Sequence, residues 1–148
     1  MVRRGFAEDR SIPELLAVLD RARSLNLTHI TDNIRHKPSF ICNCCSCCCE
    51  LLGGVMKGFP DGMAKAPFVL QIDEGSCLGC GLCWENCNVG AFEPVGANGE
   101  KIARVVEQKC LGCGACISAC PTGSLSLVSV ERPLPPDRKR DLFTRILK

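Results

Sequence analysis

Apolar residues recur at helical spacing near the start of the chain. Between residues 11 and 26, one face of a helix would carry only apolar side chains, namely Ile12, Leu15, Leu16, Leu19 and Ala22. Ser11 and Glu14 form a capping-box pattern, and Pro13 suits the first helical turn. The pattern predicts an amphipathic helix whose apolar stripe packs onto the rest of the chain or onto a partner.

The middle of the chain changes to a strand-like alternation of apolar and polar residues. The expected strands are residues 68–73, 91–95, 101–107 and 124–130. The stretch "GANGE" at 96–100 lies between the second and third of them and predicts a hairpin turn. Residues 28–33 predict a further short extended segment that ends in a turn. The expected fold class is therefore α+β.

The end of the chain is basic and partly apolar. A Pro-rich linker precedes a predicted short helix whose apolar residues are Leu142, Phe143, Ile146 and Leu147. Four apolar anchors and a net charge of +3 over residues 131–148 favour docking on the protein or a partner subunit over membrane contact. No stretch approaches the roughly 18 apolar residues that a membrane-spanning helix needs.

Cysteine content narrows the class of protein. Fourteen of the 148 residues are Cys, which is typical of a disulfide scaffold or of a metal–thiolate protein. Glu8 and Asp9 follow the first arginines where a secretory signal would be apolar, so we expect no such signal. The expected location is the cytoplasm, where thiols stay reduced and clustered cysteines bind metal.

Charge divides the chain into three expected parts. The N-terminal extension, residues 1–66, has a net charge of +2. The central domain, residues 67–130, contains 3 Lys and Arg and 6 Asp and Glu, which gives a net charge of −3. The tail, residues 131–148, has a net charge of +3. None of the three parts concentrates basic residues as a nucleic-acid-binding surface does. We therefore expect no nucleic-acid partner.

The central part contains the same cysteine spacing twice. "CLGCGLCWENC" at 77–87 and "CLGCGACISACP" at 110–121 both follow C-x2-C-x2-C-x3-C, with a period of 33 residues from Cys77 to Cys110. Gly79, Gly81, Gly112 and Gly114 lie between the cysteines, where positive φ lets the backbone turn tightly around a bound group. A pair of zinc sites is the alternative, although zinc modules usually separate two CxxC pairs by a longer spacer.

Residues 68–130 resemble the bacterial-type ferredoxin domain that holds two [4Fe–4S] clusters. The resemblance implies a small ferredoxin-like βαββαβ arrangement, with an N-terminal helical and Cys-rich extension and a short C-terminal helix added to it here. It also implies that the fourth cysteine of each run binds the other cluster. One set is then Cys77, Cys80, Cys83 and Cys120, and the second is Cys110, Cys113, Cys116 and Cys87.

One position departs from the ferredoxin pattern. Asn88 follows Cys87 where the pattern usually has Pro, whereas Pro121 keeps the rule in the second run. Asn88 is either a tolerated substitution or an amide donor near the cluster bound by Cys87, which would raise that cluster's potential. Trp84, next to Cys83, is a candidate for shielding a cluster or for packing at a surface or interface.

A second cysteine cluster precedes the central domain. The stretch "ICNCCSCCC" contains six cysteines in eight positions, namely Cys42, Cys44, Cys45, Cys47, Cys48 and Cys49. It resembles segments of incompletely characterised iron–sulfur proteins of anaerobes that also carry a two-cluster ferredoxin domain. The favoured interpretation is a third iron–sulfur cluster. The alternatives are a zinc or copper thiolate site resembling part of a metallothionein, a thiol or persulfide relay, and buried apolar cysteines.

Disulfides within this stretch are disfavoured, because neighbouring cysteines pair only under strain. The histidines His29 and His36 are candidate ligands but also suit ordinary polar positions.

The expected function is electron transfer through two [4Fe–4S] clusters, with redox proteins as partners. Nothing in the sequence indicates a nucleophile, a general base or a phosphate loop, so an electron carrier or electron-transfer subunit is favoured over an enzyme. The alternative is a redox enzyme or sensor subunit in which the Cys42–Cys49 centre is the reactive site.

Overall fold

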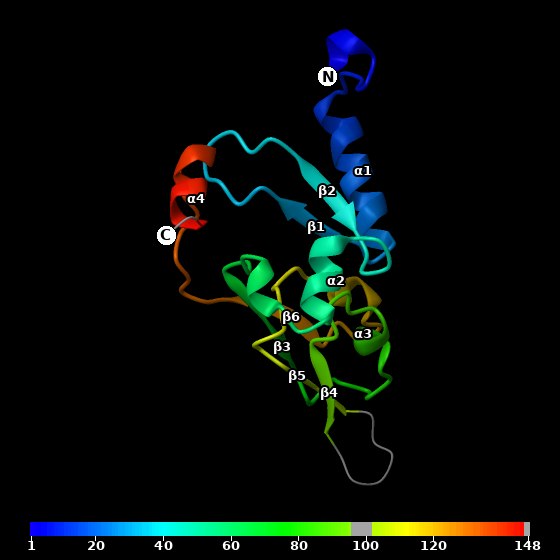
Figure 1. Cartoon of the computed structure of the whole chain (residues 1–148). Coiled ribbons are helices and arrows are strands. Elements are labelled where there is room, and N and C mark those ends of the chain that lie inside the picture. The colour runs from blue at the N-terminus through cyan, green and yellow to red at the C-terminus, as the bar shows by residue number, and fades with distance from the viewer. Residues whose placement is uncertain (96–101, 147–148) are drawn as a thin grey trace.

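The computed structural model describes residues 1–95 and 102–146 (Figure 1). Its elements in order are α1 (Ile12–Ser24), β1 (Thr28–Thr31), β2 (Ile41–Cys44), α2 (Glu50–Met56), β3 (Phe68–Ile72), α3 (Leu82–Glu85), β4 (Phe92–Val95), β5 (Ile102–Val105), β6 (Leu125–Ser129) and α4 (Lys139–Ile146). Short 3₁₀ helices are η1 (Val2–Arg4), η2 (Pro60–Gly62) and η3 (Ala115–Ala119). The strands form small two-stranded antiparallel sheets, so the molecule is a mixed helix and sheet structure.

The helix α1 forms where the apolar periodicity predicts it. The Ser11 main-chain N–H donates to Glu14 at 2.8 Å, which completes the expected capping box. The apolar stripe, however, stays largely in solvent: Ile12 is 74% exposed, and only Ala22 near the C-terminal end is buried. Figure 1 shows why, since α1 projects away from the rest of the molecule. The stripe therefore does not pack onto the rest of the chain for most of its length, and the alternative, packing onto a partner, stays a prediction.

The strands β1 and β2 form a hairpin that carries the first cysteines of the N-terminal cluster. Thr28 pairs with Cys44, and Ile30 pairs with Cys42. Thr28 and Ile30 are buried while the residues between and after them are exposed, as the period of two in a strand requires. The expected extended segment at 28–33 is confirmed for residues 28–31, and β2 is an additional strand that the sequence did not indicate.

The other four strands pair as two further two-stranded antiparallel sheets. Strand β3 lies antiparallel to β6, with Phe68 opposite Ser129, and β4 lies antiparallel to β5, with Phe92 opposite Val105. The element order from β3 to β6 is strand, helix, strand, strand, 3₁₀ helix, strand. All four expected strands are present, and the expected turn at 96–100 lies outside the described residues.

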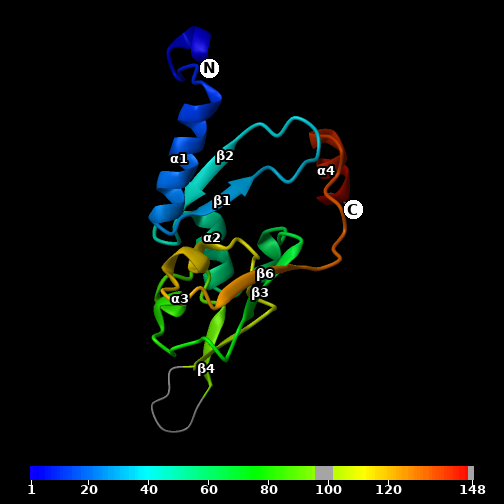
Figure 2. The same cartoon turned by 180° about the vertical axis from the view of Figure 1, so that it is seen from behind.

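One hydrophobic core connects the N-terminal segment to these sheets. Leu52 of α2 is completely buried, and it packs in the same cluster as Leu70 of β3 and Leu111. Figure 2 shows α2 lying between the β1–β2 hairpin and the strands of the central sheets. Cys42, Cys44 and Cys49 of the N-terminal segment are partly buried and pack against this core. The Cys-rich segment is therefore held next to the two cysteine motifs.

The tail returns to the N-terminal segment. The main-chain N–H of Arg35 donates to the carbonyl of Pro136 at 3.0 Å, and that of His36 donates to the carbonyl of Asp137 at 3.2 Å. The predicted C-terminal helix is confirmed as α4; Phe143 is exposed on it, and Leu147 lies outside the described residues. Among the described helices, none has the length and apolar character needed to cross a membrane.

Candidate metal centres

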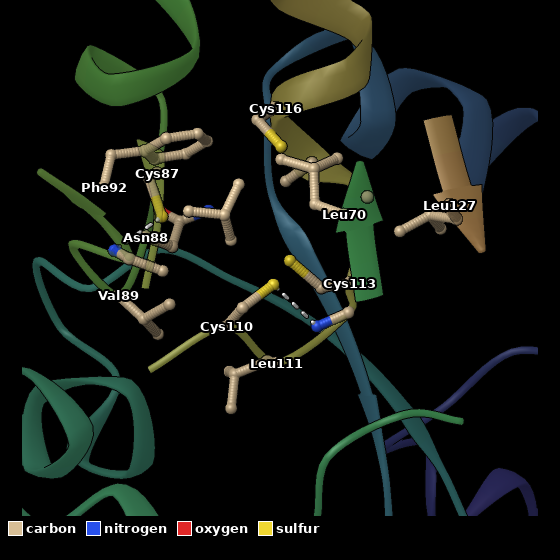
Figure 3. Close-up of a pocket in the computed structure, with 15 residues that line it drawn as sticks. Leu70, Cys87, Asn88, Val89, Phe92, Cys110, Leu111, Cys113, Cys116 and Leu127 are labelled. Atoms are coloured by element: carbon tan, nitrogen blue, oxygen red, sulfur yellow. Dashed lines mark hydrogen bonds between the residues drawn. The ribbon is translucent and has the colours of Figure 1, made fainter. Parts of the chain in front are cut away.

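The second motif and one cysteine of the first motif share a cavity. Cys110, Cys113 and Cys116 line it together with Cys87. In Figure 3 the four sulfur atoms lie around one common space. The other walls are mostly apolar, and Leu70, Val89, Phe92, Leu111 and Leu127 contribute to them. Two of the four cysteines, Cys110 and Cys116, are buried, whereas Cys87 is half-buried and Cys113 is exposed.

The first motif has a matching cavity. Cys77, Cys80 and Cys83 line it together with Cys120 of the second motif. Ile72 and Leu125 provide apolar walls. Each cavity therefore combines three cysteines of one motif with the fourth cysteine of the other.

The crossing follows from the local fold. Cys87 lies just after the short helix α3, and Cys120 ends the 3₁₀ helix η3. Each of these one-turn elements starts at the cysteine loop of its own motif and carries the fourth cysteine away from that loop. Since α3 and η3 pack against each other, each fourth cysteine reaches the opposite cavity.

The loops between the cysteines need glycine for two separate reasons. The φ angles of Gly79, Gly81, Gly112 and Gly114 are 62°, 77°, 68° and 72°, which confirms the expected left-handed backbone. At Gly112 a Cβ atom would lie 2.2 Å from the carbonyl oxygen of Phe68, so no side chain fits. This close approach joins the second cysteine loop to the start of β3.

Main-chain N–H groups in the cavity of the second motif point at sulfur. The Gly112 N–H donates to Cys110 Sγ at 3.4 Å, and the Ala91 N–H donates to Cys87 Sγ at 3.3 Å (Figure 3). Donors of this kind stabilise negative charge on a thiolate or on a group that it binds. The cavity is therefore arranged for anionic sulfur ligands.

The ionisation of the thiols differs between positions. Burial raises the pKa of Cys116 to about 12, and the neighbouring Cys113, Cys87 and Cys110 oppose its ionisation further. Burial also raises the pKa of Cys87 and of Cys83. A buried thiolate thus requires a compensating cation, and a bound metal supplies one.

Cys120 shows the opposite shift. The hydroxyl of Ser124 lowers the pKa of Cys120 to about 7, and the Thr122 hydroxyl acts in the same direction. The oxygen atoms lie 3.2 Å and 3.5 Å from Cys120 Sγ. These hydroxyls follow Cys120 closely in the sequence, so the spacing alone could have indicated them.

Asn88 has a different role from that of an amide directed at a cluster. Its Nδ2 lies 2.7 Å from the main-chain oxygen of Asn26 and 3.1 Å from Thr28 Oγ1, both of them in the N-terminal segment. Thr28 Oγ1 in turn lies 3.8 Å from Cys113 Sγ. The sequence could not indicate Thr28 as a contact of Cys113, because 85 residues separate the two.

The six cysteines of the N-terminal cluster divide into an inner and an outer group of three. Cys42, Cys44 and Cys49 form the inner group, which packs against the core. Cys42 and Cys44 share one face of β2, and their sulfur atoms are 3.4 Å apart. Burial raises the pKa of Cys44 to about 12, and its contacts with the Cys42 and Cys49 thiols raise it further.

The outer group is Cys45, Cys47 and Cys48, in the turn after β2. Cys47 and Cys48 are exposed, and their sulfur atoms are 3.6 Å apart. The sulfur atoms of Cys45 and Cys47 are in contact in this turn, and their Cα atoms are 5.4 Å apart. The turn therefore brings the two sulfurs together, and they can bind a metal as thiolates when both are reduced.

Other candidate residues have polar or solvent surroundings. His29 Nδ1 lies 2.6 Å from Asn43 Oδ1, and His36 Nε2 lies 3.8 Å from Asp137 Oδ1. Trp84 is partly exposed on α3 and lines neither cysteine cavity. Within residues 1–95 and 102–146, no group of three or more Cys, His, Asp or Glu side chains has an arrangement that could hold a single metal ion. A cubane differs from a single ion in this respect, because each of its four thiolates binds a different iron.

Comparison with known families agrees with the cysteine geometry. Residues 70–127 match the family model of the 4Fe-4S dicluster domain. The match begins in β3, ends in β6 and includes both cysteine motifs, while the Cys42–Cys49 segment lies outside it. No curated protein matches the sequence. The match supports an iron–sulfur, ferredoxin-like domain and an electron-transfer role.

Proposed function

We propose that the chain is an electron-transfer protein that holds two [4Fe–4S] clusters in residues 67–130. The first cluster is bound by Cys77, Cys80, Cys83 and Cys120. The second is bound by Cys110, Cys113, Cys116 and Cys87. The observation that carries the proposal is the pair of cavities, each lined by four cysteines in this crossed combination.

The residues around each cavity suit a cubane cluster. When bound, such a cluster supplies reversible one-electron transfer between its 2+ and 1+ states. Four thiolates provide one ligand for each iron, and the Gly112 contact leaves no room for a side chain between the cysteine loop and β3. The apolar walls limit access of water, and a low local dielectric disfavours the additional negative charge of the reduced state. We therefore expect low reduction potentials.

A third metal–thiolate centre at Cys42–Cys49 forms part of the proposal. The inner group, Cys42, Cys44 and Cys49, is the proposed core of this centre, because all three pack against the hydrophobic core and the sulfurs of Cys42 and Cys44 are 3.4 Å apart. Iron–sulfur is the preferred chemistry, and zinc or copper thiolate binding is the alternative. A reactive or sensing role for this centre is the second candidate function, and the exposure of Cys47 and Cys48 in the outer group favours it.

The proposed partners are redox proteins that present a basic surface. Residues 67–130 have a net charge of −3, and clusters with four thiolates each add further negative charge. We expect the rate of electron transfer to a small basic haem protein to fall as the ionic strength rises. A rate that is the same at low and high salt would contradict docking by charge. The proposed location is the cytoplasm, where the thiols stay reduced.

Metal stoichiometry tests the proposed function. The protein purified without oxygen should contain about 8 iron atoms and 8 sulfide ions for its two cubanes, or about 12 if the third centre is also a cubane. Cys113→Ala should lose about four iron atoms. Pro121→Ala, which changes only backbone stiffness beside a ligand, is the matched control and should keep all of them. Retention of all iron and of the reduced EPR spectrum in Cys113→Ala would contradict the proposal.

A further inference from the structure

A buried hydroxyl from the N-terminal segment reaches one of the cysteines of the second cavity. Thr28 of β1 is only 2% exposed, and its Oγ1 lies 3.8 Å from Cys113 Sγ. The matched 4Fe-4S dicluster region begins at residue 70, so this donor comes from outside it. The first cavity obtains its buried hydroxyl locally, since Ser124 Oγ lies 3.2 Å from Cys120 Sγ. The two cavities therefore depend on different parts of the chain.

The surrounding contacts fix the direction of the Thr28 hydrogen bond. The main-chain oxygen of Asn26 can only accept, so the Asn88 side-chain atom 2.7 Å from it must be the amide nitrogen. That nitrogen has a second N–H, which donates to Thr28 Oγ1 at 3.1 Å. Because the Thr28 oxygen accepts from Asn88, its single proton is available to donate to Cys113 Sγ.

We propose that Asn88 and Thr28 are positioning residues through which docking of the N-terminal segment sets the reduction potential of the cluster bound by Cys110, Cys113, Cys116 and Cys87. This inference rests on the proposed function. A hydrogen bond to a ligand sulfur stabilises the reduced cluster more than the oxidised one, because the reduced cluster carries one more negative charge. The Thr28 hydroxyl therefore raises the potential of this cluster and leaves the other one unchanged.

The same strand connects the Cys-rich segment to this cluster. Thr28 pairs with Cys44 across the β1–β2 hairpin, so a change of metal or redox state at Cys42–Cys49 that moves β2 also moves the Thr28 hydroxyl. The coupling is reciprocal, because two linked equilibria shift each other by the same free energy. Asn88 makes this connection possible, since the Pro usual at its position has no side-chain donor.

An EPR-monitored redox titration of the whole protein, purified without oxygen, tests the inference. The variants are Thr28→Val, which keeps the branched shape and removes the hydroxyl, and Asn88→Ala, which releases that hydroxyl from its position. Each should shift one midpoint potential to a more negative value and leave the second where it is in the parent. Thr28→Ser keeps a hydroxyl and should hold that potential close to the parent's.

Ser124→Ala is the matched control, because it removes a buried hydroxyl from the first cavity. It should lower the other potential, and the double variant with Thr28→Val should lower both. The inference is overturned if Thr28→Val, with its iron content intact, leaves both potentials unchanged or shifts the same one as Ser124→Ala. A parent protein that does not contain two cubanes would instead overturn the proposed function on which the inference rests.

Discussion

The side-chain amide of Asn88 lies 3.1 Å from the hydroxyl of Thr28, although 60 residues separate them in the chain. Asn88 comes one residue after a cysteine of the first motif, and Thr28 pairs with a cysteine of the N-terminal cluster. This contact places the Cys-rich segment beside the cavity of Cys110, Cys113 and Cys116. The N-terminal segment is therefore structurally continuous with the ferredoxin-like region.

Gly112→Ala should destabilise the protein more than an ordinary loop substitution. A left-handed backbone costs a non-glycine residue roughly 1–2 kcal/mol. The Cβ atom would also collide with the Phe68 carbonyl, at 2.2 Å, and would push the second cysteine loop away from β3. The measurement is the urea concentration at which half of the iron is released from the anaerobic protein.

Gly123→Ala is the control for this measurement. Gly123 also has a positive φ, 67°, but a Cβ atom there would meet nothing within 4 Å. It should therefore show only the conformational cost, and its midpoint should lie between those of the parent and Gly112→Ala. Equal midpoints for the two variants would show that the close approach at Gly112 is unimportant.

The two groups of N-terminal cysteines should differ in their effect on metal content. Changing Cys42, Cys44 and Cys49 together to Ser should remove the metal of the third centre, because these three cysteines pack against the core and two of their sulfurs are 3.4 Å apart. Changing Cys45, Cys47 and Cys48 to Ser should leave most of that metal bound. Iron and zinc are measured by elemental analysis on both triple variants and the parent. Loss of zinc instead of iron would favour the alternative chemistry, and equal losses from both variants would contradict the division into groups.

The capping box should make the helix α1 sensitive to pH. Hydrogen bonds from the Ser11 hydroxyl and main-chain N–H, followed by one from Arg10, lower the pKa of Glu14 below its usual 4.5. A lowered pKa in the folded state means that the ionised carboxylate stabilises the helix above about pH 4.5 and that this stabilisation is lost as the pH falls through the folded-state pKa. Glu14→Gln should therefore reduce hydrogen-exchange protection in α1 at neutral pH but have little effect at low pH.

Asp20→Asn is the control for the helix. Asp20 is exposed on the same helix and pairs with Arg23 at 3.3 Å, but it has no part in the cap. Its effect should be small at neutral pH, since exposed ion pairs contribute little. If Asp20→Asn reduces protection at the N-terminal end of α1 as much as Glu14→Gln does, the cap is not what stabilises this end.

The sequence was sufficient for features that depend on local spacing. The periodicity of 11–26 predicted α1, and the Ser11–Glu14 pair predicted its cap. The cysteine spacing predicted the left-handed glycines of the two loops. These succeed because helix periodicity, caps and cysteine loops each involve residues within a few positions of one another. The positions of Cys87 and Cys120 were expected only from the resemblance to two-cluster ferredoxins, because each lies in a cavity with cysteines of the other motif.

Features that depend on tertiary packing were missed. The exposure of the apolar stripe of α1 could not be predicted. Apolar periodicity predicts an amphipathic helix, but it does not show whether another part of the same chain packs against the apolar face. The strand β2 was hidden because its cysteines suggested metal binding instead of strand pairing. Thr28 was not indicated because its contact with Cys113 depends on how β1 docks.

The crossed ligation of the two clusters is tested most directly by the iron content of two double variants. Cys83→Ala with Cys120→Ala removes two cysteines from one cavity, whereas Cys116→Ala with Cys120→Ala removes two cysteines of one motif but one from each cavity. The first variant should lose about four iron atoms and the second about eight, because each cubane holds four. The reverse result, about eight from the first and about four from the second, would show that each motif binds its own cluster and would contradict the proposed ligand sets.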